Sequence, residues 1–175
     1  MKLPQFKYHL DPERSKVFQR SSGPCPRCSQ ERGLSYVGPC YGQEEVEGLC
    51  GWCIADGSAA AKWNLEFVDP AGPEPLGDPR KLDELLHRTP GYFAAQQDPW
   101  PVHCDDYCAL VGSVEWSDIK ALEPELASDM RQIEASTGMT RDELVAELSR
   151  PASPLWAHLF RCLSCARHRL VADYE

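Results

Sequence analysis

Apolar and polar side chains alternate in short runs along the chain, and glycine or proline bounds several of these runs. Alternation with a period of two predicts β-strands that bury one face and end in turns. The predicted strands cover residues 3–9, 34–37, 155–161 and 168–174. The last two flank a Cys-x-x-Cys pair, so the carboxy-terminal end of the chain has the profile of half a zinc ribbon.

Helical signals lie between these runs. Residues 79–87 follow an Asp-Pro pair, which is the expected order of a helix cap and a first-turn proline. Residues 117–136 form a second helix candidate, interrupted near Pro124 and ended by Gly138. A Thr-x-x-Glu capping box begins at Thr140 and precedes the apolar stripe of a third helix.

The composition is that of a folded protein. The chain has 175 residues, of which 42% are hydrophobic and 26% are charged, and these fractions allow a packed core in one domain of ordinary size. Residues 1–20 contain several charges and no long apolar run, so neither a signal peptide nor a membrane-spanning helix is expected. The cytoplasm is therefore the expected location.

Two Cys-x-x-Cys pairs form the strongest motif. Cys25 and Cys28 are separated from Cys50 and Cys53 by 21 intervening residues, a pattern typical of a tetrathiolate zinc site. Four protein ligands leave no open position on the ion, so the expected role is structural. The alternatives are a pair of disulfides or a redox motif, but a redox motif would occur once and beside a βαβ unit, which we do not find.

A second zinc site is expected from four of the remaining cysteines, namely Cys104, Cys108, Cys162 and Cys165. The half-ribbon at the carboxy terminus needs two more ligands, and the other two cysteines are the remaining pair close enough in sequence to approach one ion together. The 53 residues between Cys108 and Cys162 would form an insertion, which is tolerated because the entropy of loop closure grows only logarithmically with length.

Three other side chains are candidate ligands. His103 could replace one cysteine of the second site, because imidazole is an equally good zinc ligand. Adjacent residues seldom point the same way, however, so His103 and Cys104 are not expected to bind together. The odd cysteine, Cys40, is expected to be a small buried apolar residue, and His9 a hydrogen-bonded or surface residue.

The net charge is −9 with neutral histidine. If eight cysteines become thiolates around two Zn²⁺ ions, the charge falls to about −13 with both ions counted. A surface this negative repels phosphate backbones, which argues against general nucleic-acid binding. It suits a basic protein partner, and the densest acidic run, Glu44, Glu45 and Glu47, is the candidate contact rim.

The sequence also resembles a known family. The segments that carry the resemblance are residues 3–12, 36–39, 50–63, 88–91, 103–112 and 159–165, and they are similar to the CbrC-like family of bacterial proteins. One member of that family is associated with tolerance to a colicin. The resemblance extends over nearly the whole chain, and it implies a resistance or immunity role in the cytoplasm without implying a mechanism.

These patterns predict an α+β fold with zinc-ribbon-like β knuckles and an inserted helical segment. The chain is expected to form one CbrC-like domain over residues 1–175. Within it, residues 21–68 would contain a zinc ribbon and a short following helix, and residues 100–116 with 155–175 the second zinc knuckle. Residues 117–150, which contain neither cysteine nor histidine, would be the helical insertion.

The expected function is therefore that of a non-enzymatic protein that holds two structural zinc ions and binds a basic partner such as a toxin domain. One alternative is a zinc enzyme with an open metal position near Cys104 and Cys108, in which Asp105 or Asp106 would be the general base. The sequence has none of the usual zinc-hydrolase or deaminase motifs. A further alternative is nucleic-acid binding by the ribbon, but a basic stripe interleaved with aromatic residues is missing.

Overall fold

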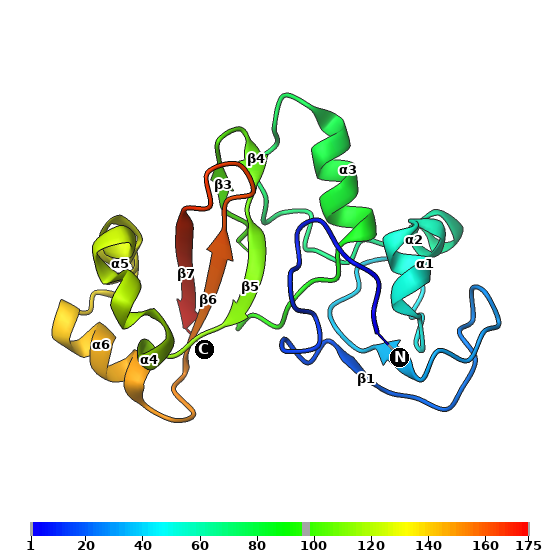
Figure 1. Ribbon diagram of the computed structural model, residues 1–175, viewed down its shortest axis with the longest axis horizontal. Helices are drawn as coiled ribbons and strands as arrows, with labels where there is room; N and C mark the ends of the chain where they lie inside the picture. Colours follow the sequence, from blue (N-terminus) through cyan, green and yellow to red (C-terminus); the bar gives the residue numbers. More distant parts are fainter. Residues whose placement is uncertain (1, 96–98, 175) are drawn as a thin grey trace.

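The computed structural model describes residues 2–95 and 99–174 as short helices and small antiparallel sheets (Figure 1). The helices are α1 Gly51–Ala55, α2 Ser58–Trp63, α3 Pro79–Arg88, α4 Trp116–Ile119, α5 Glu123–Thr137 and α6 Arg141–Ser149, with the 3-10 turn η1 Lys120–Leu122 before α5. The strands are β1 Phe18–Arg20, β2 Leu34–Tyr36, β3 Val102–His103, β4 Asp106–Tyr107, β5 Ala109–Ser113, β6 Leu155–Arg161 and β7 His168–Tyr174. The fold is therefore of the α+β class.

A three-stranded antiparallel sheet, ordered β5-β6-β7, lies in the middle of the molecule (Figure 1). Strands β6 and β7 pair along their whole length, from Leu155 with Tyr174 to Arg161 with His168. Their bounds agree with the two strands predicted at this end of the sequence. Because β6 and β7 are antiparallel neighbours, the Cys-x-x-Cys pair between them lies at one end of the sheet.

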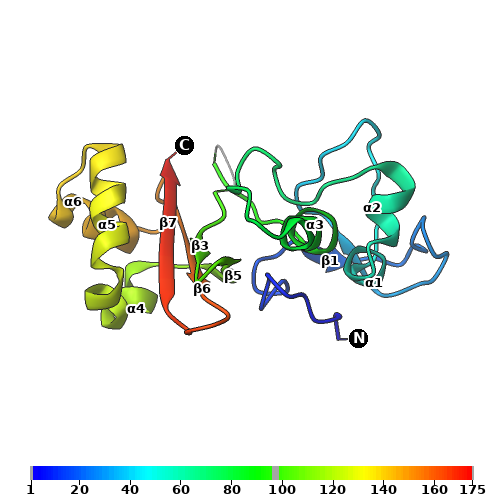
Figure 2. The same cartoon turned by 90° about the horizontal axis from the view of Figure 1, so that it is seen from above.

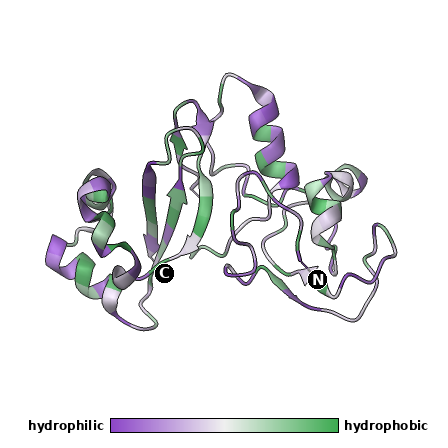
Figure 3. Ribbon diagram, viewed as in Figure 1, coloured by the Kyte–Doolittle hydropathy of each residue, from purple (hydrophilic) through white to green (hydrophobic). Residues whose placement is uncertain are grey.

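The helical segment covers one face of this sheet. Ala157, Leu159 and Leu170 are buried there against apolar residues of α5 and α6, and both views place α4, α5 and α6 on the same side of the strands (Figures 1 and 2). Figure 3 shows the hydrophobic colouring of β6 between this helical layer and the rest of the chain. The helical insertion inferred from the sequence thus packs beside the sheet that carries the second cysteine cluster.

The other face of the sheet packs against residues that precede it in the chain. Phe160 packs there with Tyr92 and Trp100. A separate cluster joins the two-stranded β1-β2 sheet to α1, α2 and the chain start, and it includes Phe6, Phe18 and Tyr36 among its buried aromatic residues. The described residues thus form three apolar clusters, and the central sheet contributes to two of them.

The predicted strand over residues 3–9 is wrong. This segment forms no ladder and makes only an isolated bridge between His9 and Leu110, where the amide of Leu110 donates to the carbonyl of Tyr8 at 2.8 Å. Leu3, Phe6 and Tyr8 are nevertheless buried. The alternation in sequence reflects side chains that anchor an extended segment to the core, rather than strand pairing.

The capping signals are confirmed. The Asp78 side chain accepts from the amide of Arg80 at the start of α3, and Thr140 opens α6 with a complete capping box. Gly138 ends α5 with a φ of 74°, a left-handed conformation that glycine adopts at little cost. Across the described residues, we find no helix with the length and apolar character needed to cross a membrane.

Candidate metal centres

The first Cys-x-x-Cys pair lies in a tight knuckle turn. The amide of Ser29 donates to the carbonyl of Cys25 at 2.7 Å, and the amide of Cys25 donates to the carbonyl of Gln30 at 3.0 Å. Ser29, the residue after the second cysteine, has a φ of 59°, in the left-handed region. This turn directs the side chains of Cys25 and Cys28 toward the same point.

The second pair lies on a helix and not in a second knuckle. Cys50 is the N-cap residue of α1, and Cys53 lies within the helix. Residues three apart face the same side of a helix, so both sulfurs can reach one ion. A zinc ribbon built from two β knuckles, as expected from the sequence, is therefore not what surrounds this group, because the spacing Cys-x-x-Cys fits both a knuckle and a first helical turn.

The structure brings these four sulfurs together. The Sγ atoms of Cys25 and Cys53 are 4.0 Å apart, those of Cys28 and Cys50 are 3.8 Å apart, and all four lie within 4.8 Å of one another. A tetrahedral ion with Zn–S bonds of about 2.3 Å places its sulfurs about 3.8 Å apart. We call these four residues the first group, and their spacing fits a tetrahedral metal ion.

Electrostatics favour a cation in the first group. Burial opposes ionisation of Cys25, but the amides of Cys28, Cys50 and Arg27 donate to its sulfur and lower the pKa to about 7. Burial and the neighbouring sulfurs raise the pKa of Cys53. Four thiolates would repel one another in this buried place, and a divalent cation offsets that repulsion.

A second knuckle repeats the geometry of the first. The amide of Ala166 donates to the carbonyl of Cys162 at 3.0 Å, and the amide of Cys162 donates to the carbonyl of Arg167 at 2.8 Å. Ala166, with a φ of 62°, occupies the same left-handed position after the second cysteine, Cys165. The knuckle connects β6 to β7, as the half-ribbon prediction requires.

A hairpin from another part of the chain meets this knuckle. Strands β3 and β4 pair through His103 and Asp106, and the two residues between them, Cys104 and Asp105, have φ values of 53° and 57°. Two left-handed residues at the centre of a two-residue loop define a type I′ turn. Figure 1 shows this hairpin beside the β6-β7 turn at one end of the central sheet.

The second group consists of His103, Cys104, Cys162 and Cys165, whose ligand atoms all lie within 4.8 Å of one another. The Nδ1 atom of His103 is 3.2 Å from the sulfur of Cys104 and 3.4 Å from that of Cys165. The group offers three sulfurs and one imidazole nitrogen, which is a common ligand set for Zn²⁺. Within the described part of the chain, no further group of this kind gathers.

Cys108 was expected to be a ligand of the second zinc site, and the structure places it elsewhere. It is fully buried in the apolar cluster that contains Trp100 and Phe160, and the structure does not place its sulfur in the second group. The indole nitrogen of Trp100 donates to its carbonyl at 2.7 Å, and burial raises the pKa of its thiol to about 12. Cys108 therefore belongs to the core, and His103 stands in the place expected for it.

Side chains from distant elements hold the hairpin in position. Arg169 donates to the carboxylate of Asp129, a buried residue of α5, and also to the carbonyl of Val102 next to His103. On the other side, Lys81 of α3 bonds the carbonyl and carboxylate of Asp105. Sequence inspection missed these contacts, because the partners lie in helices with no motif linking them to the hairpin.

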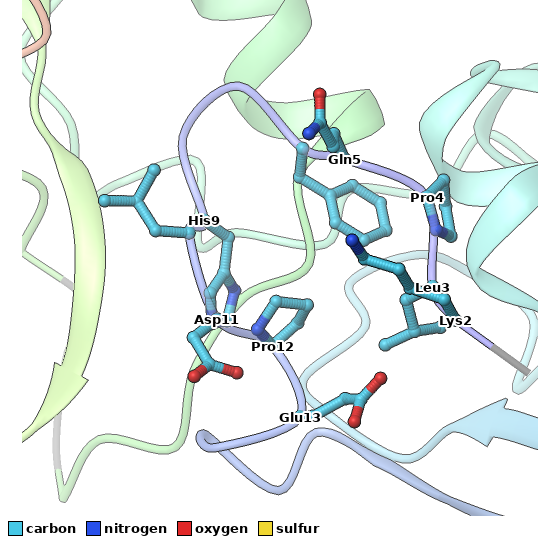
Figure 4. Close-up of a pocket in the computed structure, with 10 residues that line it drawn as sticks. Lys2, Leu3, Pro4, Gln5, His9, Asp11, Pro12 and Glu13 are labelled. Atoms are coloured by element: carbon cyan, nitrogen blue, oxygen red, sulfur yellow. The ribbon is translucent and has the colours of Figure 1, made fainter.

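The remaining candidates lie elsewhere. His9 is buried beside a groove of about 620 Å³ that Lys2 and Glu13 also line (Figure 4). Its Nδ1 donates to the carbonyl of Pro90 and its Nε2 accepts from Ser15, both at 2.8 Å. Both ring nitrogens are occupied, which confirms the hydrogen-bonded role expected for His9.

Cys40 is exposed, so the expectation that it is buried is wrong. The residue lines an open groove of about 940 Å³ together with the acidic run Glu44, Glu45 and Glu47. Proline and glycine flank this stretch, and it forms a loop between β2 and α1 without regular structure. A small apolar side chain is buried only where an element packs over it, and none does so here.

The fold and the two groups define an α+β protein with two preformed sets of ligands, each of which could hold a metal ion. Residues 3–174 match the model of the Uncharacterised protein family (UPF0167), and the chain belongs to this family. It is 38% identical to UPF0167 proteins of Mycobacterium bovis and Mycobacterium tuberculosis, over 99% of this chain and 94% of each relative. A UPF0167 protein of Pseudomonas aeruginosa is 34% identical, over 98% of this chain and 97% of the relative. No solved structure matches the chain.

Proposed function

We propose that the protein binds two structural zinc ions, one in each group, and that its activity is the binding of a basic protein partner. The observation that carries the zinc assignment is the spacing of the sulfurs, 3.8 and 4.0 Å for two pairs of the first group and at most 4.8 Å for the others. Such closed sets of four protein ligands leave no coordination position for water or substrate. Metal binding to such sites contributes on the order of 10 kcal/mol of folding free energy in small zinc peptides.

Charge supports the choice of a basic partner. The chain has a net charge of −9, and the groove beside the β1-β2 sheet is lined by Glu44, Glu45 and Glu47. Val37 and Val46 line the same groove, so a bound segment would meet both carboxylates and apolar surface. Complementary charge accelerates association and disfavours acidic competitors.

The resemblance to the CbrC-like family supports a role in tolerance to a bacterial toxin, exercised in the cytoplasm, where thiols stay reduced. Nuclease toxins need basic surfaces to hold phosphates, so an acidic protein can cover such a surface. The zinc ions would keep the binding face folded. Only the two knuckles of the protein are like those of a zinc ribbon, because the other two ligands of the first group come from a helix.

The alternative of a zinc enzyme at the second group needs a general base beside the metal. Asp105 bonds Lys81, and Asp106 accepts from Tyr8 and Lys7. Burial raises the pKa of the Asp106 carboxyl, but these donors outweigh it and hold the pKa below its usual value, which makes a weak base. Nucleic-acid binding is disfavoured by the overall negative charge.

Two measurements test the proposal. Elemental analysis of the purified full chain should give two zinc ions per molecule, and one or none would overturn the assignment. An affinity pull-down from the native bacterium at low salt should recover a basic protein, released as salt rises. Salt-dependent binding to DNA, or hydrolysis of an ester or phosphodiester by the zinc-bound protein, would instead favour one of the alternatives.

A further inference from the structure

The two groups differ in how far their sulfurs are shielded. In the first group Cys25, Cys50 and Cys53 are 1–3% exposed. In the second group Cys162 is 2% exposed, but Cys104 and Cys165 lie on the surface. Cys28, the fourth residue of the first group, is half-buried. A small oxidant can therefore reach two surface thiolates in the second group, but at most one partly covered thiolate in the first. Thiolate character and access together decide which cysteines are oxidised.

The two exposed cysteines also lie close to each other. Both sulfurs approach the same atom, Nδ1 of His103, at 3.2 and 3.4 Å, and they lie within 4.8 Å of one another. A disulfide requires an S–S distance of about 2.05 Å. Cys104 lies in a hairpin turn and Cys165 in a knuckle turn, so the remaining movement can occur at two loop tips without disturbing the sheet.

We propose that the second group is a site of oxidation by hydroperoxides, at which Cys104 and Cys165 form a disulfide and the metal ion is released. This inference rests on the proposed function, that the second group holds zinc. Release follows because oxidation removes two of the four ligands and leaves His103 and Cys162, too few to retain a structural ion. The first group keeps its ion, because the half-buried Cys28 has only buried cysteines beside it as disulfide partners.

The chemistry balances without a further reactant. The thiolate of Cys165 attacks one oxygen of hydrogen peroxide, the O–O bond breaks, and hydroxide leaves to give a sulfenic acid. The thiolate of Cys104 then attacks that sulfur and displaces a second hydroxide. Two protons from solvent convert both hydroxides to water, so two thiolates are oxidised, one peroxide is reduced, and Zn²⁺ leaves without a change in oxidation state.

The test uses the full zinc-bound chain. Hydrogen peroxide is added in small excess, released zinc is followed with a coloured chelator, and the disulfide is mapped by mass spectrometry of non-reduced peptides. We expect one of two zinc equivalents to be released, one disulfide that joins Cys104 to Cys165, and recovery of zinc binding after a dithiol reductant. Equal loss from both groups, or a disulfide between Cys162 and Cys165, would overturn the inference.

Two variants serve as controls. Cys40→Ser removes an exposed cysteine outside both groups, so peroxide should release zinc from it as from the wild type. Cys104→His keeps a zinc ligand but removes one disulfide partner, so it should retain two zinc ions and resist release. If Cys104→His fails to bind zinc at the second group, the disulfide mapped in the oxidised wild type still tests the inference, because it either joins Cys104 to Cys165 or does not. A wild-type chain with one zinc contradicts the proposed function, whereas two zinc ions that resist peroxide contradict this inference alone.

Discussion

The Nδ1 atom of His103 lies 3.2 Å from the Sγ atom of Cys104, the next residue in the chain. Successive side chains of a strand point to opposite faces, so both could not face one ion if the strand continued. The strand ends at His103, however, and Cys104 enters the left-handed region as the first residue of a type I′ turn. This change of backbone conformation puts two adjacent residues into one ligand set.

The first prediction concerns the identity of the fourth ligand. His103→Ala should lower the zinc content from two ions to about one, because three ligands no longer close the second tetrahedron. Cys108→Ala is the matched variant, since Cys108 is the buried cysteine nearest in sequence to the group, and it should keep both ions. Elemental analysis and the absorption of cobalt-substituted protein measure the outcome. If Cys108→Ala loses zinc and His103→Ala does not, then Cys108 is the fourth ligand, as the cysteine spacing predicted.

A second prediction concerns the first group. Cys25→Ser or Cys53→Ser removes one of four thiolates from a covered site, so the ion should bind weakly and soluble yield should fall. Cys40→Ser should leave metal content and yield unchanged, because its sulfur lies outside both groups. Loss of one zinc equivalent in Cys40→Ser would show that the odd cysteine has been assigned wrongly.

The sequence alone predicted local features better than tertiary ones. Caps at Asp78 and Thr140 are set by residues within one turn, and the structure has both. The Cys-x-x-Cys spacing located the sulfurs of the first group, but it could not distinguish a knuckle from the helical start at Cys50. Spacing within a few residues carries information about the ligands and much less about the backbone that holds them.

The second group was harder to predict, because its ligand choice depends on backbone conformation. The residue types of 103–108 do not predict that two consecutive non-glycine residues, Cys104 and Asp105, adopt positive φ. The spacing Cys104-x-x-x-Cys108 therefore favoured two cysteines over the adjacent histidine. The contacts that fix the turn come from Lys81 and Arg169, distant in sequence, and such tertiary contacts leave no periodic signal.

The ion pair between Asp129 and Arg169 provides a third prediction. Asp129 is 4% exposed, and it also accepts the amide of Leu170 at 2.8 Å. Asp129→Ala should reduce the free energy of unfolding by about 3 kcal/mol, because it leaves the guanidinium without its charge partner in a largely buried place. It should also weaken zinc binding at the second group, since Arg169 holds the carbonyl of Val102. Ser128→Ala, an exposed neighbour on α5, is the control, and urea unfolding with zinc titration measures both effects.

A fourth prediction concerns acid. Burial lowers the pKa of His9 and of His158 from 6.5 to about 4, so the unfolded chain binds more protons than the folded one between these values. The contribution of the neutral histidines to the free energy of unfolding is therefore fully present above pH 6.5. It falls as the pH drops toward 4, by about 2 kcal/mol per histidine at pH 5. Urea unfolding of wild type and His9→Gln at pH 7.5 and pH 5 should give a smaller pH effect in the variant. Both proteins carry the same metal ligands, so metal loss cancels in the comparison, and equal slopes would contradict the prediction.

The last prediction concerns the acidic groove and requires a captured partner. Three glutamates line the groove, at positions 44, 45 and 47. They lie in a loop, so replacing them with residues of opposite charge should disturb no helix or strand. Replacement of all three by lysine should slow association with a basic protein more than it speeds dissociation, because charge at a contact rim acts mainly on the encounter. The same effect should shrink as salt rises, since screening shortens the field to about 8 Å at physiological ionic strength. A matched variant reverses Glu13, Glu74 and Asp142, three exposed carboxylates outside the groove, with the same change of net charge and a smaller expected loss of association rate. Surface-based kinetics at two salt concentrations compare the association rates of the wild type and both variants. If the association rate changes neither with salt nor in the groove variant, the partner contacts another surface.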